Sequence, residues 1–192
     1  MSACIVDFEP TAVADDFRRA MRHVVGAISI ITVGRGKTLS GMTVSSVSSL
    51  SVDPPSLIVT VDRASSSWPL LREYGVFGIN ILNADQIDTA ERFSGKDGAK
   101  GAERFAGASW VTRPSGVHLL SGTLASIECA VEDVIERYSH AIVIGRVRWL
   151  QLSEPNAALA YWHGSYIAID RGEDLAHLAE VSLPTTHLKR RP

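Results

Sequence analysis

The residues best suited to chemistry gather between positions 41 and 67, and their types suit a flat ligand that carries a phosphate. The first group is GMTVSSVSSL at 41–50, which mixes short hydroxylated residues with Val44, Val47 and Leu50. None of them is large or charged, so a flat ligand could lie close to the backbone and meet its N–H and C=O groups. The apolar side chains could face a core. A half-buried strand without a ligand explains the same composition equally well.

The second group is Ser65, Ser66 and Ser67, which precede a short helix. Ser67 is a good helix N-cap, and Pro69 is tolerated in the first turn. The start of a helix presents unpaired N–H groups and a partial positive charge, so an anion such as a phosphate would be well held there. Taken alone, the serine run is explained more simply by ordinary capping.

Other familiar chemical motifs are absent. The six histidines form neither an HExxH motif nor a Cys/His cluster, so no metal site is expected. The GKT at 36–38 lacks the glycine that a phosphate-binding loop needs at position 31, where Ile31 stands. No GxGxxG follows an expected strand, which argues against a Rossmann nucleotide site. Two cysteines make no disulfide framework, and Cys129, in an apolar segment, is interpreted as a small buried hydrophobe.

Length and charge narrow the class further. A chain of 192 residues suits one substantial domain, which we place at 15–170, with an extension at 1–14 and a tail at 171–192. The formal net charge of −2 gives no reason to expect nucleic-acid binding. No apolar run is long enough for a membrane span, and the start lacks the pattern of a secretion signal, so we expect a cytoplasmic protein without a membrane partner.

The elements that must position these residues are mostly strands. An amphipathic helix is expected from Asp15 or Asp16 to about residue 25, and a second from Asn83 to Phe93 with Gln86 in a capping box. Apolar, alternating or β-branched runs predict strands at 27–33, 41–52, 57–61, 76–82, 123–135 and 140–152. A last patterned stretch at 157–169 places aromatic residues around His163 and Gly164.

Hairpins or short helices link these strands, without regular βαβ alternation. An antiparallel, mainly β barrel with peripheral helices fits best. The polar, glycine-bearing stretch 94–107 is expected to form either a mobile loop near the site or a passive surface loop.

Taken together, the segments resemble the short-chain flavin reductase family, the reductase components of two-component flavin monooxygenases. The matching pieces run from about Phe17 to Ile169, in the family's order and spacing. They are FRRAMRHVVGAISIITV, GMTVSSVSSLSVDPP, SSSWPLL, FGINIL, ERFSG, SIECAV, HAIVIGRV and YWHGSY. The resemblance implies a Greek-key-like, FMN-binding split β-barrel that works as a homodimer and binds FMN or FAD. It also implies NADH or NADPH as co-substrate without a Rossmann domain.

By position, the resemblance assigns residues to both ligands. Ser65, Ser66 and Ser67 fall where the family holds the flavin phosphate, and His140 and Tyr166 fall near the nicotinamide. The residues expected along the flavin ring and ribityl chain are Thr43, Val44, Ser45, Ser46 and Val47, with Ser49 and Leu50 nearby.

One departure from the family concerns the nicotinamide side. Gly-Asp often precedes the histidine in the family, whereas Tyr138 and Ser139 precede His140 here. Loss of that carboxylate removes a group that could orient the imidazole or raise its pKa. A strand-start histidine bonded to a turn and a core aromatic explain His140 and Tyr166 without any ligand.

The implied activity is hydride transfer from C4 of the nicotinamide to N5 of the flavin, which supplies reduced flavin to a monooxygenase. The flavin carries the chemistry, so no catalytic acid, base or nucleophile is assigned. Two alternatives remain open. One is a flavin carrier or redox sensor without efficient turnover, and the other is a split-barrel oxidase of the pyridoxamine phosphate type.

Overall fold

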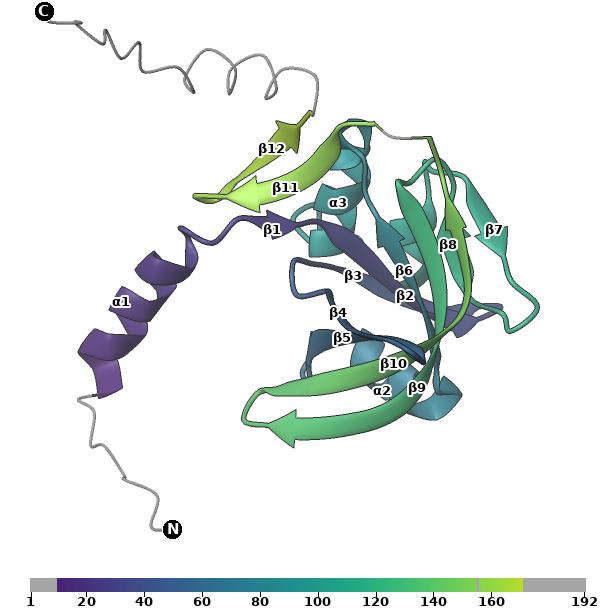
Figure 1. Ribbon diagram of the computed structural model, residues 1–192, viewed down its shortest axis with the longest axis horizontal. Helices are drawn as coiled ribbons and strands as arrows, with labels where there is room; N and C mark the ends of the chain where they lie inside the picture. The colour runs from purple at the N-terminus through teal and green to yellow at the C-terminus, as the bar shows by residue number, and fades with distance from the viewer. Residues whose placement is uncertain (1–9, 155, 171–192) are drawn as a thin grey trace, which may run out of the picture.

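The computed structural model describes residues 10–154 and 156–170. The predicted tail at 171–192 and Cys4 lie outside these residues. Within them, the main body is a seven-stranded antiparallel sheet in the order β3-β2-β6-β9-β10-β5-β4 (Figure 1). Its strands are β2 (Ser29–Arg35), β3 (Thr38–Val44), β4 (Ser48–Val52), β5 (Pro55–Asp62), β6 (Val76–Ile81), β9 (Ala125–Arg137) and β10 (His140–Leu152).

The two outermost strands of this sheet, β3 and β4, are consecutive in the chain. Only Ser45, Ser46 and Val47 connect them, so the Cα atoms of Val44 and Ser48 lie at most about 14 Å apart. The sheet therefore curls until its free edges approach each other without pairing. Ser46 lies in this connection, and its hydroxyl contacts both N and O of Thr60 at 3.2 Å. The result is a split barrel, which confirms the predicted fold class.

The single strand predicted across 41–52 was wrong, because the chain breaks at 45–47. Two strand residues three positions apart face opposite sides of a sheet. Val44 and Val47 nevertheless pack against the same core cluster. The chain must turn between them, and the break meets that requirement.

The barrel interior is filled by aliphatic and aromatic side chains from five strands. Ile31, Val59, Phe77, Cys129 and Val143 are each fully buried. α2 (Ser67–Tyr74) closes the core with the buried Leu71, and Gly75 ends the helix in the left-handed conformation that favours glycine. Burial of the Cys129 thiol agrees with its interpretation as a small hydrophobe, and burial raises its pKa to about 12.

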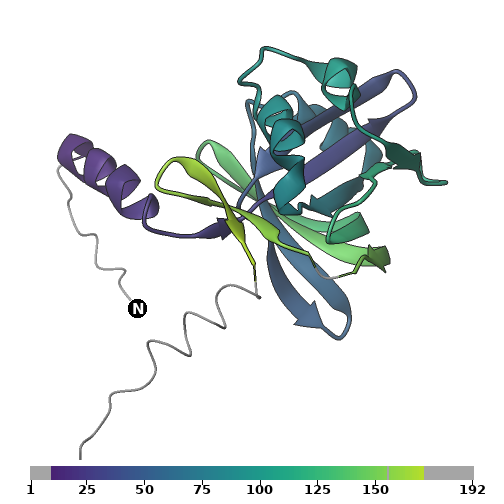
Figure 2. The same cartoon turned by 90° about the horizontal axis from the view of Figure 1, so that it is seen from above.

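A second layer lies beside the barrel (Figures 1 and 2). It contains a three-stranded sheet of β1 (Gly26–Ala27), β11 (Ala158–Trp162) and β12 (Ser165–Ile169). It also contains η1 (Ala84–Gln86), α3 (Ile87–Ser94) and η2 (Gly101–Phe105). The capping box of Asn83 and Gln86 is present as predicted. The small hairpin of β7 (Trp110–Thr112) and β8 (His118–Leu120) was not predicted.

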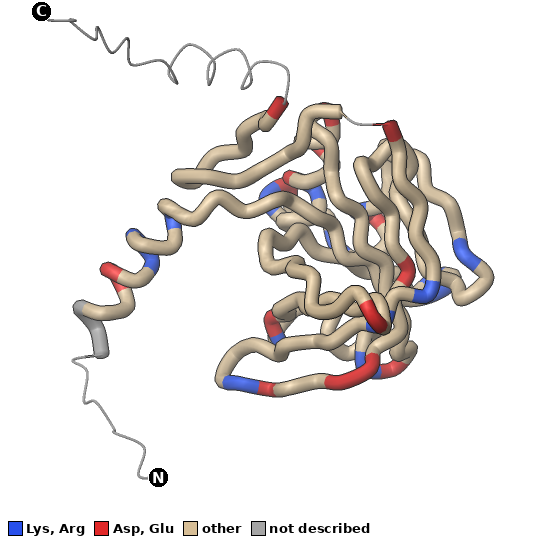
Figure 3. Tube along the Cα trace, viewed as in Figure 1, with Lys and Arg blue, Asp and Glu red and all other residues tan. Residues whose placement is uncertain are grey.

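The first helix, α1 (Pro10–Met21), begins five residues or more before the predicted start. It extends away from the barrel in both views (Figures 1 and 2). Its apolar side chains stay accessible, with Phe17 60% and Met21 48% exposed. Charges of both signs are interspersed along α1 and around the body (Figure 3). No helix among the described residues is long and apolar enough to cross a membrane.

Candidate functional site

The serine run lies at the start of α2, where the structure gathers four hydroxyl groups. The Ser40 hydroxyl on β3 shares hydrogen bonds with those of Ser66 at 2.9 Å and Ser67 at 3.0 Å. The N-cap is Ser66 and not Ser67 as predicted, because the chain enters the helix one residue earlier. The Ser66 side chain makes no capping bond.

Ser65 supplies the strongest sign of a ligand at this position. Its Oγ is buried and is the one such side-chain N or O atom without a hydrogen-bond partner in the described part of the chain. Buried polar groups are normally satisfied, and an orphan of this kind needs an explanation. A phosphate at the start of α2 would accept from the Ser65 hydroxyl and from the helix N–H groups. The residues present therefore fit the phosphate of a flavin.

The break between β3 and β4 offers the backbone that a flavin ring would need. The β2–β3 ladder ends at Val44, and the β4–β5 ladder begins at Ser48. Ser45, Ser46 and Val47 lie outside both ladders, and none of their backbone groups forms one of the other backbone–backbone bonds of the described residues. Their N–H and C=O groups can meet the donors and acceptors of a ligand edge.

Two of the predicted hydroxyls serve the fold instead. Thr43 Oγ1 donates to the carbonyl of Ala90 on α3 at 2.6 Å, and the Ser46 hydroxyl is bonded to Thr60. Ser49 and Leu50 lie exposed on β4, away from the break itself. In this region a ligand would therefore contact mainly the unpaired backbone groups, which the small side chains leave accessible, and not these two hydroxyls.

A cavity of about 220 Å³ lies beside the end of β3 and brings together residues from four parts of the chain. It is lined by Ile28, Thr43, Val44, Ser45, Ser94, Lys96, Tyr161 and Tyr166. The structure therefore places Tyr166 next to three of the residues predicted along the flavin. The rings of Tyr161 and Tyr166 meet edge to face, 5.2 Å apart, and form an aromatic wall.

Sequence reasoning missed Ser94 and Lys96. Lys96 Nζ lies 3.2 Å from Oε1 of Glu91 and 5.2 Å from the centre of the Tyr166 ring. The hydrogen bond to Glu91 raises the pKa of Lys96. Burial raises the pKa of Tyr166, and the charge of Lys96 opposes that rise. The cavity thus has a neutral phenol with a charged ammonium beside it.

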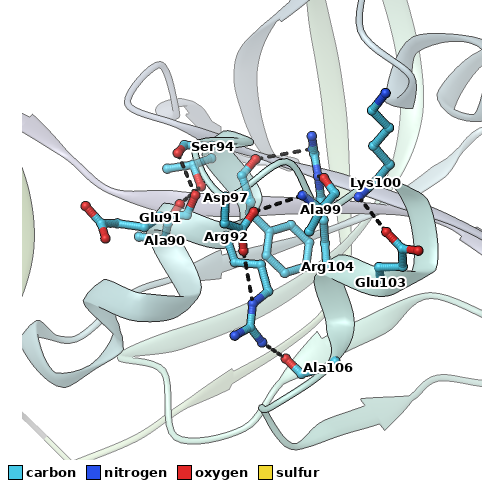
Figure 4. A network of polar contacts seen from close by, with 12 residues as sticks. Ala90, Glu91, Arg92, Ser94, Asp97, Ala99, Lys100, Glu103, Arg104 and Ala106 are labelled. Carbon is cyan, nitrogen blue, oxygen red and sulfur yellow. Dashed lines mark hydrogen bonds and ion pairs between the residues drawn. The ribbon is translucent and has the colours of Figure 1, made fainter.

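The loop that carries Lys96 is held on the barrel by arginines (Figure 4). Arg104 Nη1 donates to the carbonyl of Gly41 at 2.6 Å, and its Nε donates to Ala99 at 2.9 Å. Arg92 Nη1 donates to the carbonyl of Ala106. The stretch 94–107 thus lies near the site, as the first of the two expectations had it, but these bonds anchor it to the barrel, whereas that expectation was of a mobile loop.

His140 does not line this cavity. It begins β10 at the tip of the β9–β10 hairpin, is exposed, and its Nδ1 lies 2.9 Å from the Ser139 hydroxyl. Asp62 is its Cα partner across β5, so a carboxylate stands on the neighbouring strand. Arg63 ties this tip down through the carbonyl of Tyr138 and an ion pair with Glu136. The tip therefore lies next to the chain that leads into Ser65.

The arrangement can bind and orient a flavin and a second ring. No group of three or more His, Cys, Asp or Glu residues suited to a metal ion occurs among the described residues. The function of such a site would depend on positioning and on the electronics of the bound ring.

Comparison with known proteins identifies the family of the chain. Residues 21–170 match the family described as flavin reductase like domain. The chain is 30% identical to the reductase subunit HsaB of a flavin-dependent monooxygenase from Rhodococcus jostii, over 80% of this chain and 77% of that protein. It is 31% identical to the FMN reductase (NADH) RutF of Stutzerimonas stutzeri, over 83% and 90%.

Among solved structures, the NADH:FAD oxidoreductase SgcE6 of Streptomyces globisporus matches with a TM-score of 0.76 at 26% identity, over 88% of this chain and 99% of that one. The family match spans most of the chain, and the structural match covers 88% of it. This chain therefore belongs to the flavin reductase-like domain family.

Proposed function

We propose that this protein is an NAD(P)H-dependent flavin reductase that transfers a hydride to FMN or FAD. The observation that carries the proposal is the buried, unpartnered Ser65 hydroxyl at the uncapped start of α2. It lies in a serine cluster that joins β3 to α2, and β3 leads directly to the unpaired backbone at 45–47. A phosphate and a flat ring held at these two places describe a flavin mononucleotide.

In this proposal the chain's residues bind and orient. Ser65, Ser66 and Ser67 hold the phosphate, and the backbone from Ser45 to Val47 meets the polar edge of the ring. When bound, the flavin accepts at N5 the two electrons that the dihydronicotinamide gives up at C4. Tyr166 contributes a flat wall for the nicotinamide, and the role of His140 on the nicotinamide side stays a prediction. Correct stacking of two rings accounts for much of the rate in such a reaction.

The product, reduced flavin, would supply a separate monooxygenase. The names of the relatives from Rhodococcus jostii and Stutzerimonas stutzeri support this role and the use of NADH. The name of the structural neighbour supports FAD as an alternative to FMN. The choice between the two flavins, the use of NADPH and a cytoplasmic location stay predictions.

The exposed face of α1 supports the predicted homodimer. Phe17, Met21 and Val24 are 60%, 48% and 59% exposed, and with Trp162 they line a cavity of about 330 Å³ between α1 and β11. Contiguous apolar surface of this kind marks an interaction site. A second copy of the chain is the occupant that the family resemblance implies.

Light scattering coupled to size-exclusion chromatography tests the dimer. The wild-type protein should elute as a dimer, and the double substitution Phe17→Asp, Met21→Asp should give a folded monomer. Arg19→Asp on the same helix serves as a control, because Arg19 is paired with Asp16 on the polar face. A monomeric wild type, or a dimer in the double variant, would contradict the proposed interface.

The activity is tested by mixing the protein with FMN or FAD and with NADH or NADPH in the absence of oxygen. Rapid loss of the yellow colour, dependent on the protein, is the expected result. An unchanged spectrum with bound flavin would support the carrier or sensor alternative, which the Tyr138-Ser139 departure motivates. Bleaching by pyridoxamine phosphate, with no response to either nicotinamide, would support the oxidase alternative.

A further inference from the structure

Lys96 stands at the candidate site, and no role in the reaction has been given to it. It is the one cation among the residues that line the 220 Å³ cavity beside Thr43, Val44 and Ser45. Its ammonium lies over the Tyr166 ring, 5.2 Å from the ring centre. Its side chain is 57% exposed, which places the charge at the rim of the cavity.

The flavin phosphate is a poor candidate for the anion that Lys96 would bind. Ser40, on β3, bonds to the serines of α2, whereas Thr43, three residues on, bonds to Ala90 of α3. Residues an odd number apart in a strand face opposite sides of a sheet. The serine cluster that suits the phosphate thus lies on one face of β3, and Lys96 belongs to the segment that follows α3 on the other face.

The charge on the flavin ring is also a poor match for Lys96. An ammonium that is more than half exposed is screened by water and stabilises charge in a neighbouring ring only weakly. A solvent-facing diphosphate requires no burial of the cation. Only one ribose separates the nicotinamide of NADH from its diphosphate, so a nicotinamide near Tyr166 brings the diphosphate to the rim where Lys96 lies.

The acidic groups around Lys96 give its charge a further role. Glu91 is its ion-pair partner at 3.2 Å, and Asp88, Glu91 and Asp97 line an adjoining cavity together with Lys96 and Arg92. Without the lysine, this side of the site would present mainly carboxylates and would repel a dinucleotide. Lys96 both offsets Glu91 and offers three donors to a phosphate.

We propose that Lys96 binds the diphosphate of the nicotinamide dinucleotide while the nicotinamide lies against Tyr166. The inference rests on the proposed function and makes Lys96 a specificity-determining residue for the reductant. It predicts that the protein distinguishes NADH from a dihydronicotinamide that carries no phosphate.

The test compares NADH with N-benzyl dihydronicotinamide as reductants of the FMN-loaded protein. In Lys96→Met, the ratio of kcat/KM for NADH to that for the phosphate-free donor should fall about tenfold, at the low end for a charge-assisted bond because the site is exposed. Lys96→Arg should keep most of the ratio. Lys100→Met, an exposed lysine in the same loop that does not line the cavity, is the matched control.

Calorimetry with ADP-ribose, which contains the diphosphate but no nicotinamide, gives a readout independent of turnover. Its affinity for the FMN-loaded protein should fall about tenfold in Lys96→Met, and the Kd for FMN should not change. Equal losses with both donors, or a weaker Kd for FMN, would overturn the proposal by assigning Lys96 to the flavin. The proposal would also be overturned if the kcat/KM ratio and the ADP-ribose affinity of Lys96→Met were the same as those of Lys100→Met. If the wild type binds ADP-ribose but NADH bleaches no flavin, the proposed function fails and the assignment of Lys96 stands.

Discussion

Replacing Ser65 with alanine should have opposite effects on the free and the flavin-bound protein. Without a ligand, the Ser65 Oγ is buried and has no hydrogen-bond partner. Removing it abolishes an unsatisfied polar atom, so Ser65→Ala should raise the free energy of unfolding of the flavin-free protein. With FMN bound, the same hydroxyl would donate to the phosphate. Its loss should then weaken binding.

The magnitudes follow from the two states of this one atom. A buried polar group that loses its partner costs about 1 to 3 kcal/mol, so its removal from the free protein should stabilise by roughly 1 kcal/mol. For a domain of this size that corresponds to an increase in Tm of about 2 to 4 °C. A charge-assisted hydrogen bond contributes about 1.5 to 3 kcal/mol, so the Kd for FMN should rise by at least about tenfold. Riboflavin has no phosphate, and its Kd should not change.

Thermal unfolding of the flavin-free protein and fluorescence titration with FMN and riboflavin measure both effects. Ser126→Ala is the matched control, because the Ser126 hydroxyl is buried but bonded to Leu120 and Thr123. It should lower the Tm and leave the ratio of the two Kd values unchanged. The reasoning would be refuted if Ser65→Ala lowered the Tm and weakened the affinity for FMN and for riboflavin equally, since Ser65 would then be a structural serine.

Three further predictions concern the thiol, the loop anchor and the hairpin tip. Burial raises the pKa of the Cys129 thiol from 9.0 to about 12, so above pH 9 the unfolded chain loses this proton while the folded chain keeps it. The free energy of unfolding should therefore fall by up to about 1.4 kcal/mol per pH unit between those two pKa values. Urea unfolding at several pH values measures this fall, which should be absent in Cys129→Ala. Arg104→Met removes the hydrogen bonds to Gly41 and to two other carbonyls, so it should lower the free energy of unfolding by about 3 kcal/mol. Amide hydrogen exchange in the loop 94–107 should become faster, and an unchanged exchange rate would contradict the anchoring role of Arg104. His140→Ala should raise KM for NADH about tenfold without changing the Kd for FMN, and Ser139→Ala should have a smaller effect of the same kind; steady-state kinetics that show no change in KM would remove His140 from the site.

Local patterns were enough to predict most of the barrel. The alternation in 123–135, a possible turn at 136–139 and the run at 140–152 predicted the long hairpin that β9 and β10 form. The break at 45–47 has no such local mark, since every residue there suits a strand. The spacing of Val44 and Val47 was the available signal, because two core residues three positions apart cannot share one face of a straight strand.

The site was harder to predict from the sequence than the barrel, because its residues come together only in the folded chain. Ser65 could be placed at a helix start, but its lack of a partner depends on the neighbours that folding brings to it. Lys96 lies in a polar loop that resembles many passive loops. Its proximity to Tyr166, 70 positions later, follows from the packing of β12 beside α3, and no periodicity within either segment encodes that contact.

The position of β3 at a free edge of the sheet explains how one strand can serve both ends of an extended ligand. An interior strand has neighbours on both sides, so a molecule that contacts both of its faces would have to pass through the sheet. At an edge, a ligand can pass from one face to the other around the open side. Arg104 covers that side at Gly41, so the crossing would lie beyond it, toward Val44. The unpaired residues at 45–47 lie where that open side ends. Splitting the barrel at this point therefore leaves unpaired the backbone groups at 45–47 that a flavin would use.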